Sequence, residues 1–156
     1  MSNKSGARPG LMSGRSHEMT LIMPLKPGGA ERLRKKLGPD KFPGSWALDH
    51  VGTVHDLRYV IFDNDTRLLF ASTYDGDWDA YINDFVAKIP DEIEAVFGEV
   101  QDFRGIRSPN IKDDIVKYQI SSLYFYSAYP DASVRDVKKA LKVKGGLDVI
   151  LDEATS

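Results

Sequence analysis

Apolar positions in the middle of the chain recur with two different periods, which predict a strand pair followed by a helix. Two runs rich in β-branched and aromatic residues, 53–62 and 67–73, flank Asp63-Asn64-Asp65-Thr66, whose Asn and Asp side chains favour a tight turn. From Trp78 to Ile89 the apolar residues instead recur at steps of three and four, as on one face of a helix. A second helical segment begins at Pro90 and ends at Gly98.

Before this region the pattern predicts one short strand and one short helix. Met19–Leu25 reads as a strand, and Pro24 places it at a sheet edge or at a strand end because proline lacks a backbone donor. Apolar residues on one stripe of 30–37 predict an amphipathic helix, which Gly38-Pro39 ends. A turn-rich stretch follows through Phe42-Pro43-Gly44 and Trp46.

The last third of the chain predicts a connector, a strand and a final helix. Gly105–Asp114 is mostly connector, and Val116–Ala128 is rich enough in aromatic and β-branched residues to predict a strand. Ser133-Val134-Arg135-Asp136 has the spacing of a capping box at a helix start. Gly145-Gly146 is expected to end this helix, and a short tail follows. The helix would bury a stripe made of Val134, Val137, Ala140 and Leu141.

The order strand, helix, strand, strand, helix, strand predicts the α+β class. We expect a ferredoxin-like βαββαβ fold, in which a four-stranded antiparallel sheet carries two helices on one face, with an extra C-terminal helix. Residues 1–18 are expected to form a flexible N-terminal arm because Ser, Gly, Lys and Arg dominate there without periodicity. Residues 19–156 then make one domain, as the length of 156 residues suggests.

Both faces of the predicted sheet are largely apolar, although helices on one side shield only one of them. Alternation along 54–62 and 120–126 leaves apolar side chains on each face of the sheet. We therefore expect a homodimer in which sheet packs on sheet, with a cavity at the open face. In 54–62 the two sets are His55, Leu57, Tyr59 and Ile61 on one face, and Val54, Asp56, Arg58, Val60 and Phe62 on the other.

Composition narrows the classes of function. The 21 basic and 23 acidic residues leave a net charge of −2, which disfavours nucleic acid as a partner. The absence of cysteine excludes disulfides, thiolate catalysis and cysteine-bound metals, and favours the cytoplasm. The apolar runs are too short to span a bilayer, so we expect no membrane association.

The strand order, His55-Asp56-Leu57-Arg58 at the start of an apolar strand, and Ser72-Thr73-Tyr74-Asp75-Gly76-Asp77 before an aromatic helix resemble the dimeric α+β barrel superfamily. The resemblance covers roughly 19–129, and the chain is in particular similar to uncharacterised bacterial members in which a His, an Arg three residues later and a Tyr-Asp-Gly turn recur. That superfamily includes antibiotic-biosynthesis monooxygenases, which use no cofactor, and heme-binding relatives. The resemblance therefore implies either a bound heme or no cofactor, and the chain lacks the long second domain of the larger heme enzymes.

His55 and Arg58 are the candidate catalytic residues. His55 suits a general base or a single axial heme or metal ligand, or else a histidine that is hydrogen-bonded at a strand end. Arg58 needs an anion, supplied either by Asp56 or a neighbouring carboxylate, or by a ligand. His50 with Asp49 and Asp56 would complete a metal site beside His55.

Further residues are candidates for substrate binding. Tyr74 and Asp75 form either a turn and helix cap or the rim of a pocket. The tyrosines of the last strand either hydrogen-bond an aromatic substrate or pack in an interface. The candidate substrate-binding residues are Tyr59, Tyr74, Asp75, Tyr124 and Tyr126.

Three functions follow as expectations. The first is an oxidoreductase, a monooxygenase or heme-dependent peroxidase type of enzyme, acting on an apolar or aromatic metabolite. The second is a non-catalytic ligand-binding or stress-response module that uses the same cavity. The third is a cofactor-free isomerase, cyclase or decarboxylase. The fold alone does not decide between them.

Overall fold

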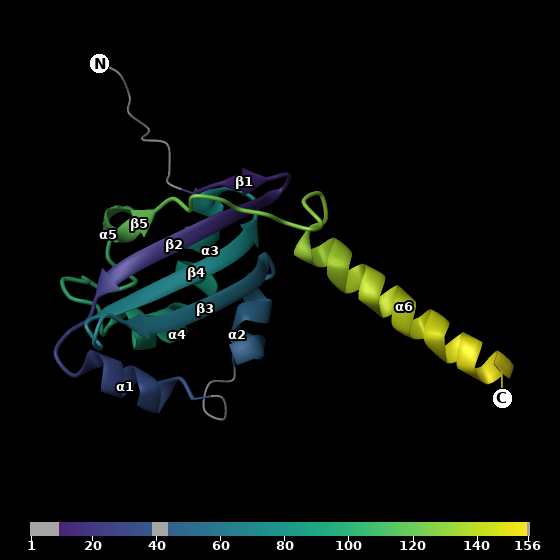
Figure 1. The fold of residues 1–156 in the computed structure, drawn as a ribbon, viewed down its shortest axis with the longest axis horizontal. Coiled ribbons are helices and arrows are strands. Elements are labelled where there is room, and N and C mark those ends of the chain that lie inside the picture. The colour runs from purple at the N-terminus through teal and green to yellow at the C-terminus, as the bar shows by residue number, and fades with distance from the viewer. Residues whose placement is uncertain (1–9, 39–43, 156) are drawn as a thin grey trace, which may run out of the picture.

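An antiparallel sheet of five strands organises the chain, whose computed structural model describes residues 10–38 and 44–155 (Figure 1). The sheet order is β1-β2-β4-β3, and β5 also pairs with β2, so β1 and β5 share the outer edge of β2. Because β2 and β3 both run antiparallel to β4, they run parallel to each other. The strands are β1 (Met12–Ser13), β2 (Ser16–Pro24), β3 (Val54–Phe62), β4 (Arg67–Asp75) and β5 (Gln119–Ile120).

Six helices accompany the sheet in the described chain, and five of them contribute to its covered side. Helices α3 and α4 lie behind the sheet in Figure 1, and the side toward the viewer carries no helix. Helix α6 instead projects away from the body (Figure 1). The helices are α1 (Gly29–Lys36), α2 (Gly44–Val51), α3 (Trp78–Lys88), α4 (Pro90–Phe97), α5 (Ile111–Tyr118) and α6 (Val134–Thr155).

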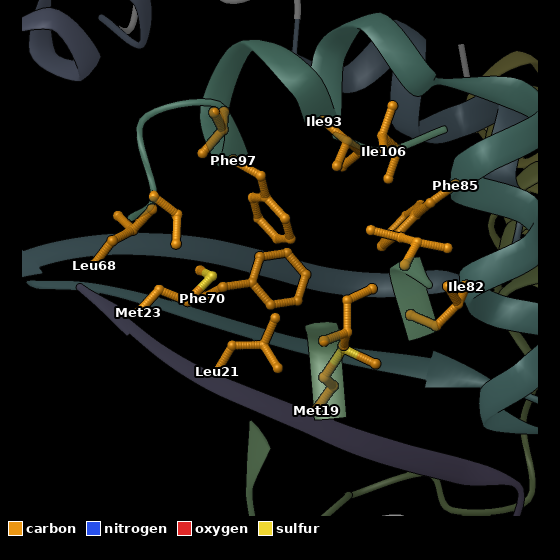
Figure 2. Close-up of a cluster of buried hydrophobic side chains, with 14 of the residues drawn as sticks. Met19, Leu21, Met23, Leu68, Phe70, Ile82, Phe85, Ile93, Phe97 and Ile106 are labelled. Carbon is orange, nitrogen blue, oxygen red and sulfur yellow. The ribbon is translucent and has the colours of Figure 1, made fainter. Parts of the chain in front are cut away.

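The core lies between the sheet and these helices. Leu21 of β2 and Tyr59 of β3 are both cross-strand partners of Phe70 on β4, so the three side chains form one row across the sheet. Figure 2 shows Phe70 meeting Phe85 of α3 and Phe97 of α4, and its ring lies edge-on to both. Edge-to-face packing and burial of apolar area in this row stabilise the layered arrangement.

A β-bulge near the start of β3 changes which residues share a face. Val54 pairs with Tyr74, and Asp56 pairs with Thr73, so His55 is an extra residue between two consecutive pairs. Val54 therefore packs against the core, whereas the simple alternation predicted it on the opposite face. The prediction that His55 shares a face with Leu57 is wrong for the same reason.

The uncovered face of the sheet is apolar at one end and polar at the other. Ile22 and Val60 flank Leu69 in register, which makes an apolar row, and the exposed fraction of Val60 is 43%. Toward the other end Glu18 and Asp56 flank Thr73. The expectation of a largely apolar second face is thus met over only part of the sheet.

Three segments differ from the predicted elements. Strand β2 begins at Ser16 and pairs on both sides, so it is not an edge strand, although Pro24 does end it. Residues 12–18, predicted as part of the arm, belong to β1, its turn and β2, and residues 1–9 lie outside the described chain. Of the predicted strand 116–128, only Gln119–Ile120 is a strand, because 111–118 form α5.

The C-terminal region also departs from the prediction. Helix α6 continues through Gly145-Gly146 to Thr155, and of its residues Val134 alone is buried. The predicted capping box is confirmed: the Asp136 backbone N–H donates to Ser133 Oγ at 3.1 Å, and the Ser133 N–H donates to Asp136 Oδ2 at 3.0 Å. Part of the predicted turn-rich stretch, 39–43, lies outside the described residues, and 44–51 form α2.

Glu99 joins α1 to the end of α4 through two cations. Its side chain is 10% exposed, and its carboxylate accepts hydrogen bonds from Arg32 Nε at 2.9 Å and Lys36 Nζ at 2.8 Å. The hydrogen bond from Arg32 and the contact with Lys36 lower the pKa of Glu99 below its usual 4.5. A carboxyl whose folded pKa is lowered stabilises the fold above its unfolded pKa, and this contribution is lost as the pH falls through the folded pKa.

We expect Glu99→Gln to lower the free energy of unfolding at pH 7 by on the order of 1 kcal/mol. Below pH 4.5 the difference between variant and wild type should shrink, because the Glu99 carboxyl of the unfolded wild type takes up a proton before that of the folded protein. Urea unfolding at pH 7 and at about pH 3 measures both values. A difference that is equal at the two pH values would show that this carboxylate does not act through its charge.

Candidate functional site

A groove of about 720 Å³ runs along the free edge of β3. Its walls come from α1, α2 and β3, and most of the surface is apolar. Side chains of both faces of β3 take part, since the groove follows the strand edge. The apolar lining includes Leu33, Leu37, Leu48, Leu57, Tyr59 and Ile61.

Two arginines reach this groove in different electrostatic states. Arg34 makes two short hydrogen bonds to Asp65, 2.7 and 2.6 Å, which neutralise its charge and lower the pKa of Asp65. Arg58 approaches Asp56 only to 3.7 Å between Nη1 and Oδ1, and its side chain is 66% exposed. Arg58 therefore keeps a guanidinium that can bind an anion at the mouth of an apolar groove.

Tyr59 is the one predicted substrate-binding residue that lines the groove together with Arg58. Its ring lies 5.5 Å from that of Phe70, tilted, so the core fixes its position. Burial raises the pKa of the Tyr59 hydroxyl well above its usual value of 10. The phenol therefore stays protonated near neutral pH.

His55 and Asp75, both predicted as site residues, come together outside the groove. A hydrogen bond of 2.7 Å joins His55 Nε2 and Asp75 Oδ1, and the two side chains are 21% and 13% exposed. Asp75 Oδ2 also accepts the backbone N–H of Val134 at 2.7 Å. The bulge in β3, the end of β4 and the start of α6 thus meet at one carboxylate.

Tyr74 lies in the core and not on a pocket rim. Its ring stacks on Tyr81 with centroids 3.8 Å apart and an interplanar angle of 1°. The ring of His17 also stacks on that of Tyr74, with the two ring centroids 5.6 Å apart. The Nδ1 atom of His17 is buried without a hydrogen-bond partner. His17 lies in the stretch 1–18 that was expected to form a flexible arm, but it belongs to β2. The helix cap is as expected, since Asp77 Oδ1 accepts the Ala80 N–H at 2.9 Å.

Tyr124 and Tyr126 lie apart from all of these residues. Both belong to the irregular segment between β5 and α6, where their exposed fractions are 78% and 71%. Glu18 fastens the start of this segment to β2: Oε1 accepts the N–H of Ser122 at 2.9 Å and that of Leu11 at 3.0 Å. The predicted site residues therefore occupy four separate places: the groove, the His55–Asp75 contact, the core around Tyr74, and the exposed segment after β5.

No metal site forms around His55 among the residues that the structure describes, because no three His, Asp or Glu side chains gather there or elsewhere. Asp49 bonds instead to Lys138 of α6 at 2.7 Å. Axial heme ligation through His55 Nε2 does not fit this arrangement, since that nitrogen is held by Asp75 and His55 does not line the groove.

A comparison with models of protein families, with curated proteins and with solved structures finds no match to this chain. Nor is any helix of residues 10–38 and 44–155 both long enough and apolar enough to cross a bilayer. The site is therefore interpreted from its own geometry.

Sequence reasoning missed the helical wall of the groove. Leu33 and Leu37 were identified as an apolar stripe, yet nothing in that stripe shows which side faces a hollow. Leu48 was missed with the whole of α2. The run Ala47, Leu48 and Val51 has helical spacing, and this was the signal that would have revealed the helix.

We expect the His55–Asp75 contact to act as a positioning bond at the root of α6. In a double-mutant cycle of His55→Ala and Asp75→Ala, the two side chains should couple by about 1 kcal/mol in the free energy of unfolding. Hydrogen exchange of the Val134 amide should also quicken in Asp75→Ala, because that amide loses its acceptor. Additive effects of the two substitutions would contradict this role.

Proposed function

We propose that this protein is a non-catalytic binding module whose groove beside β3 holds an apolar small molecule that carries an acidic group. The observation that carries the proposal is a largely apolar groove of about 720 Å³ with the exposed guanidinium of Arg58 at its mouth. This volume lies within the usual range of roughly 300–1,000 Å³ for small-molecule sites.

The proposed ligand follows from what each wall offers. Leucine and isoleucine side chains favour burial of a hydrocarbon portion of the ligand, at about 25 cal/mol per Å² of apolar surface. A carboxylate accepts two parallel hydrogen bonds from one guanidinium, which fixes the orientation of the molecule. The uncharged side chain of Tyr59 adds aromatic surface to the wall and no competing charge.

Binding is favoured over the predicted oxidative chemistry by where His55 lies. A general base must reach the reacting atom, and His55 does not line the groove, because its ring bonds to Asp75 near the start of β3. The groove walls named above offer two arginines and a tyrosine but no histidine or carboxylate. This distribution supports recognition of a ligand and supplies no proton-transfer group beside it.

We further propose that the fold is ferredoxin-like. Without β1, the strands follow one another in the chain as β2, β3, β4 and β5, and lie in the sheet as β5-β2-β4-β3. This arrangement places the two parallel strands of a split βαβ unit around a third strand. The short β5, the added β1 and the additional helices α2, α4 and α5 are departures from the simplest form.

Arg58→Gln should weaken binding of an apolar carboxylate about tenfold, because one charge-assisted interaction is lost. The measurement is displacement of the anionic apolar dye 1-anilinonaphthalene-8-sulfonate by decanoate and by decanol. Wild type should bind decanoate more tightly than decanol, and Arg58→Gln should bind the two alike.

Arg107→Gln is the matched control, since Arg107 is 65% exposed and paired with Asp91 away from the groove. That variant should retain the wild-type preference for decanoate. If neither compound displaces the dye, or if both bind equally to wild type, the proposed ligand class is wrong.

A further inference from the structure

Helix α6 carries large apolar side chains that nothing in the described chain covers. Beyond its first turn it leaves the body (Figure 1), and Val143, Leu147 and Ile150 are 63, 52 and 63% exposed. A helix of 22 residues is about 33 Å long, and helices in water are stabilised mainly by packing of an apolar face. The stability of this helix therefore requires a covering surface.

Five apolar residues of α6 form a continuous seam along the helix. The steps between them alternate between three and four residues, as in helices that pair side by side. Gly145 and Gly146 fall outside the seam, so it passes them without interruption. The seam consists of Ala140, Val143, Leu147, Ile150 and Ala154.

Charge divides the same helix into two unlike halves. Residues 134–144 contain the acidic Asp136 and five basic residues, whereas 145–155 contain three acidic residues and no basic one. An antiparallel pair of such helices places each basic half against an acidic half, and a parallel pair places like charges together. The basic residues are Arg135, Lys138, Lys139, Lys142 and Lys144, and the acidic ones are Asp148, Asp152 and Glu153.

We propose that α6 pairs antiparallel with α6 of a second copy of this chain and so forms a homodimer. Ala140 then lies against Ile150 of the other copy, and Val143 against Leu147. Both contacts occur twice about the two-fold axis, so one surface complements itself.

The attachment of α6 to the body explains why its apolar seam is covered by a second copy and not by the groove of the same chain. The helix is fixed at its start by the Val134 N–H to Asp75 and by Lys138 to Asp49. A continuous helix so fixed projects away from its own body, as Figure 1 shows for α6, and Leu147 and Ile150 are exposed. The self-complementary charge pattern then identifies an identical helix as the partner.

The first test is the oligomeric state of the full chain by light scattering at micromolar concentrations. Wild type should be a dimer, and Leu147→Asp should raise the dissociation constant at least a hundredfold, because two carboxylates would enter the seam. Val149→Asp is the matched control: Val149 is 57% exposed but lies on the other side of the helix, so this variant should remain dimeric.

The second test determines the direction of pairing by disulfide cross-linking. Because the chain has no cysteine, only the introduced thiols can react. Ala140→Cys alone should not cross-link, since its two copies would be about 15 Å apart along an antiparallel pair. A mixture of Ala140→Cys and Ile150→Cys should cross-link on oxidation. Ile150→Cys mixed with Ala87→Cys, which places the thiol on the exposed side of α3, should not.

Three results would overturn the proposal. A monomeric wild type would show that α6 does not pair in solution. A dimer that Leu147→Asp leaves intact would place the interface elsewhere, such as on the uncovered sheet face. Efficient cross-linking of Ala140→Cys with itself would show parallel helices.

Discussion

Burial of one face of the β2–β4 pair is the constraint on which the other elements depend. The two strands pair over nine residues, and Met19, Leu21 and Met23 of β2 project toward the same side as Phe70. A shift of one residue would turn this whole set toward solvent, so the register is strongly determined. Strand β3 satisfies the same constraint by its bulge, which returns Val54 to the core and turns His55 toward Asp75. A packing requirement in the core thereby produces the polar contact that anchors α6.

Elements whose signals are local were predictable from the sequence. The hairpin of β3 and β4 follows from alternation around a turn, and α3 with α4 follows from apolar spacing and from Pro90 and Gly98. The capping box at Ser133 is equally local, since both partners lie within one helical turn. Of the candidate site, Arg58 and Tyr59 were identified and do line one groove. The pairing of His55 with Asp75 was not foreseen, although a hydrogen-bonded histidine at a strand end was one of the alternatives.

The features that were not predicted depend on long-range packing. The β-branched and aromatic residues after Asp114 favour a strand locally, but burial of Ile111, Asp114 and Ile115 on one side makes this segment a helix. Asp114 is held there by Arg104, a partner that no local pattern reveals. The bulge at His55 likewise arises from competition between strand alternation and core packing. Two glycines normally end a helix, at about 1 kcal/mol each relative to alanine, yet α6 continues through them.

Helix α2 connects the two surfaces on which the functional proposals rest. Leu48 forms part of the groove wall, and the next residue, Asp49, bonds to Lys138 at the root of α6. Neighbouring residues of a helix point about 100° apart, so one short helix faces both the groove and α6. Any rigid movement of α2 that widens or narrows the groove therefore also displaces the acceptor of Lys138. The Lys138–Asp49 pair is exposed on both sides, so the hydrogen bond from the Val134 N–H to the more buried Asp75 is the firmer attachment of α6. The groove and the root of the projecting helix thus contact two consecutive side chains of α2.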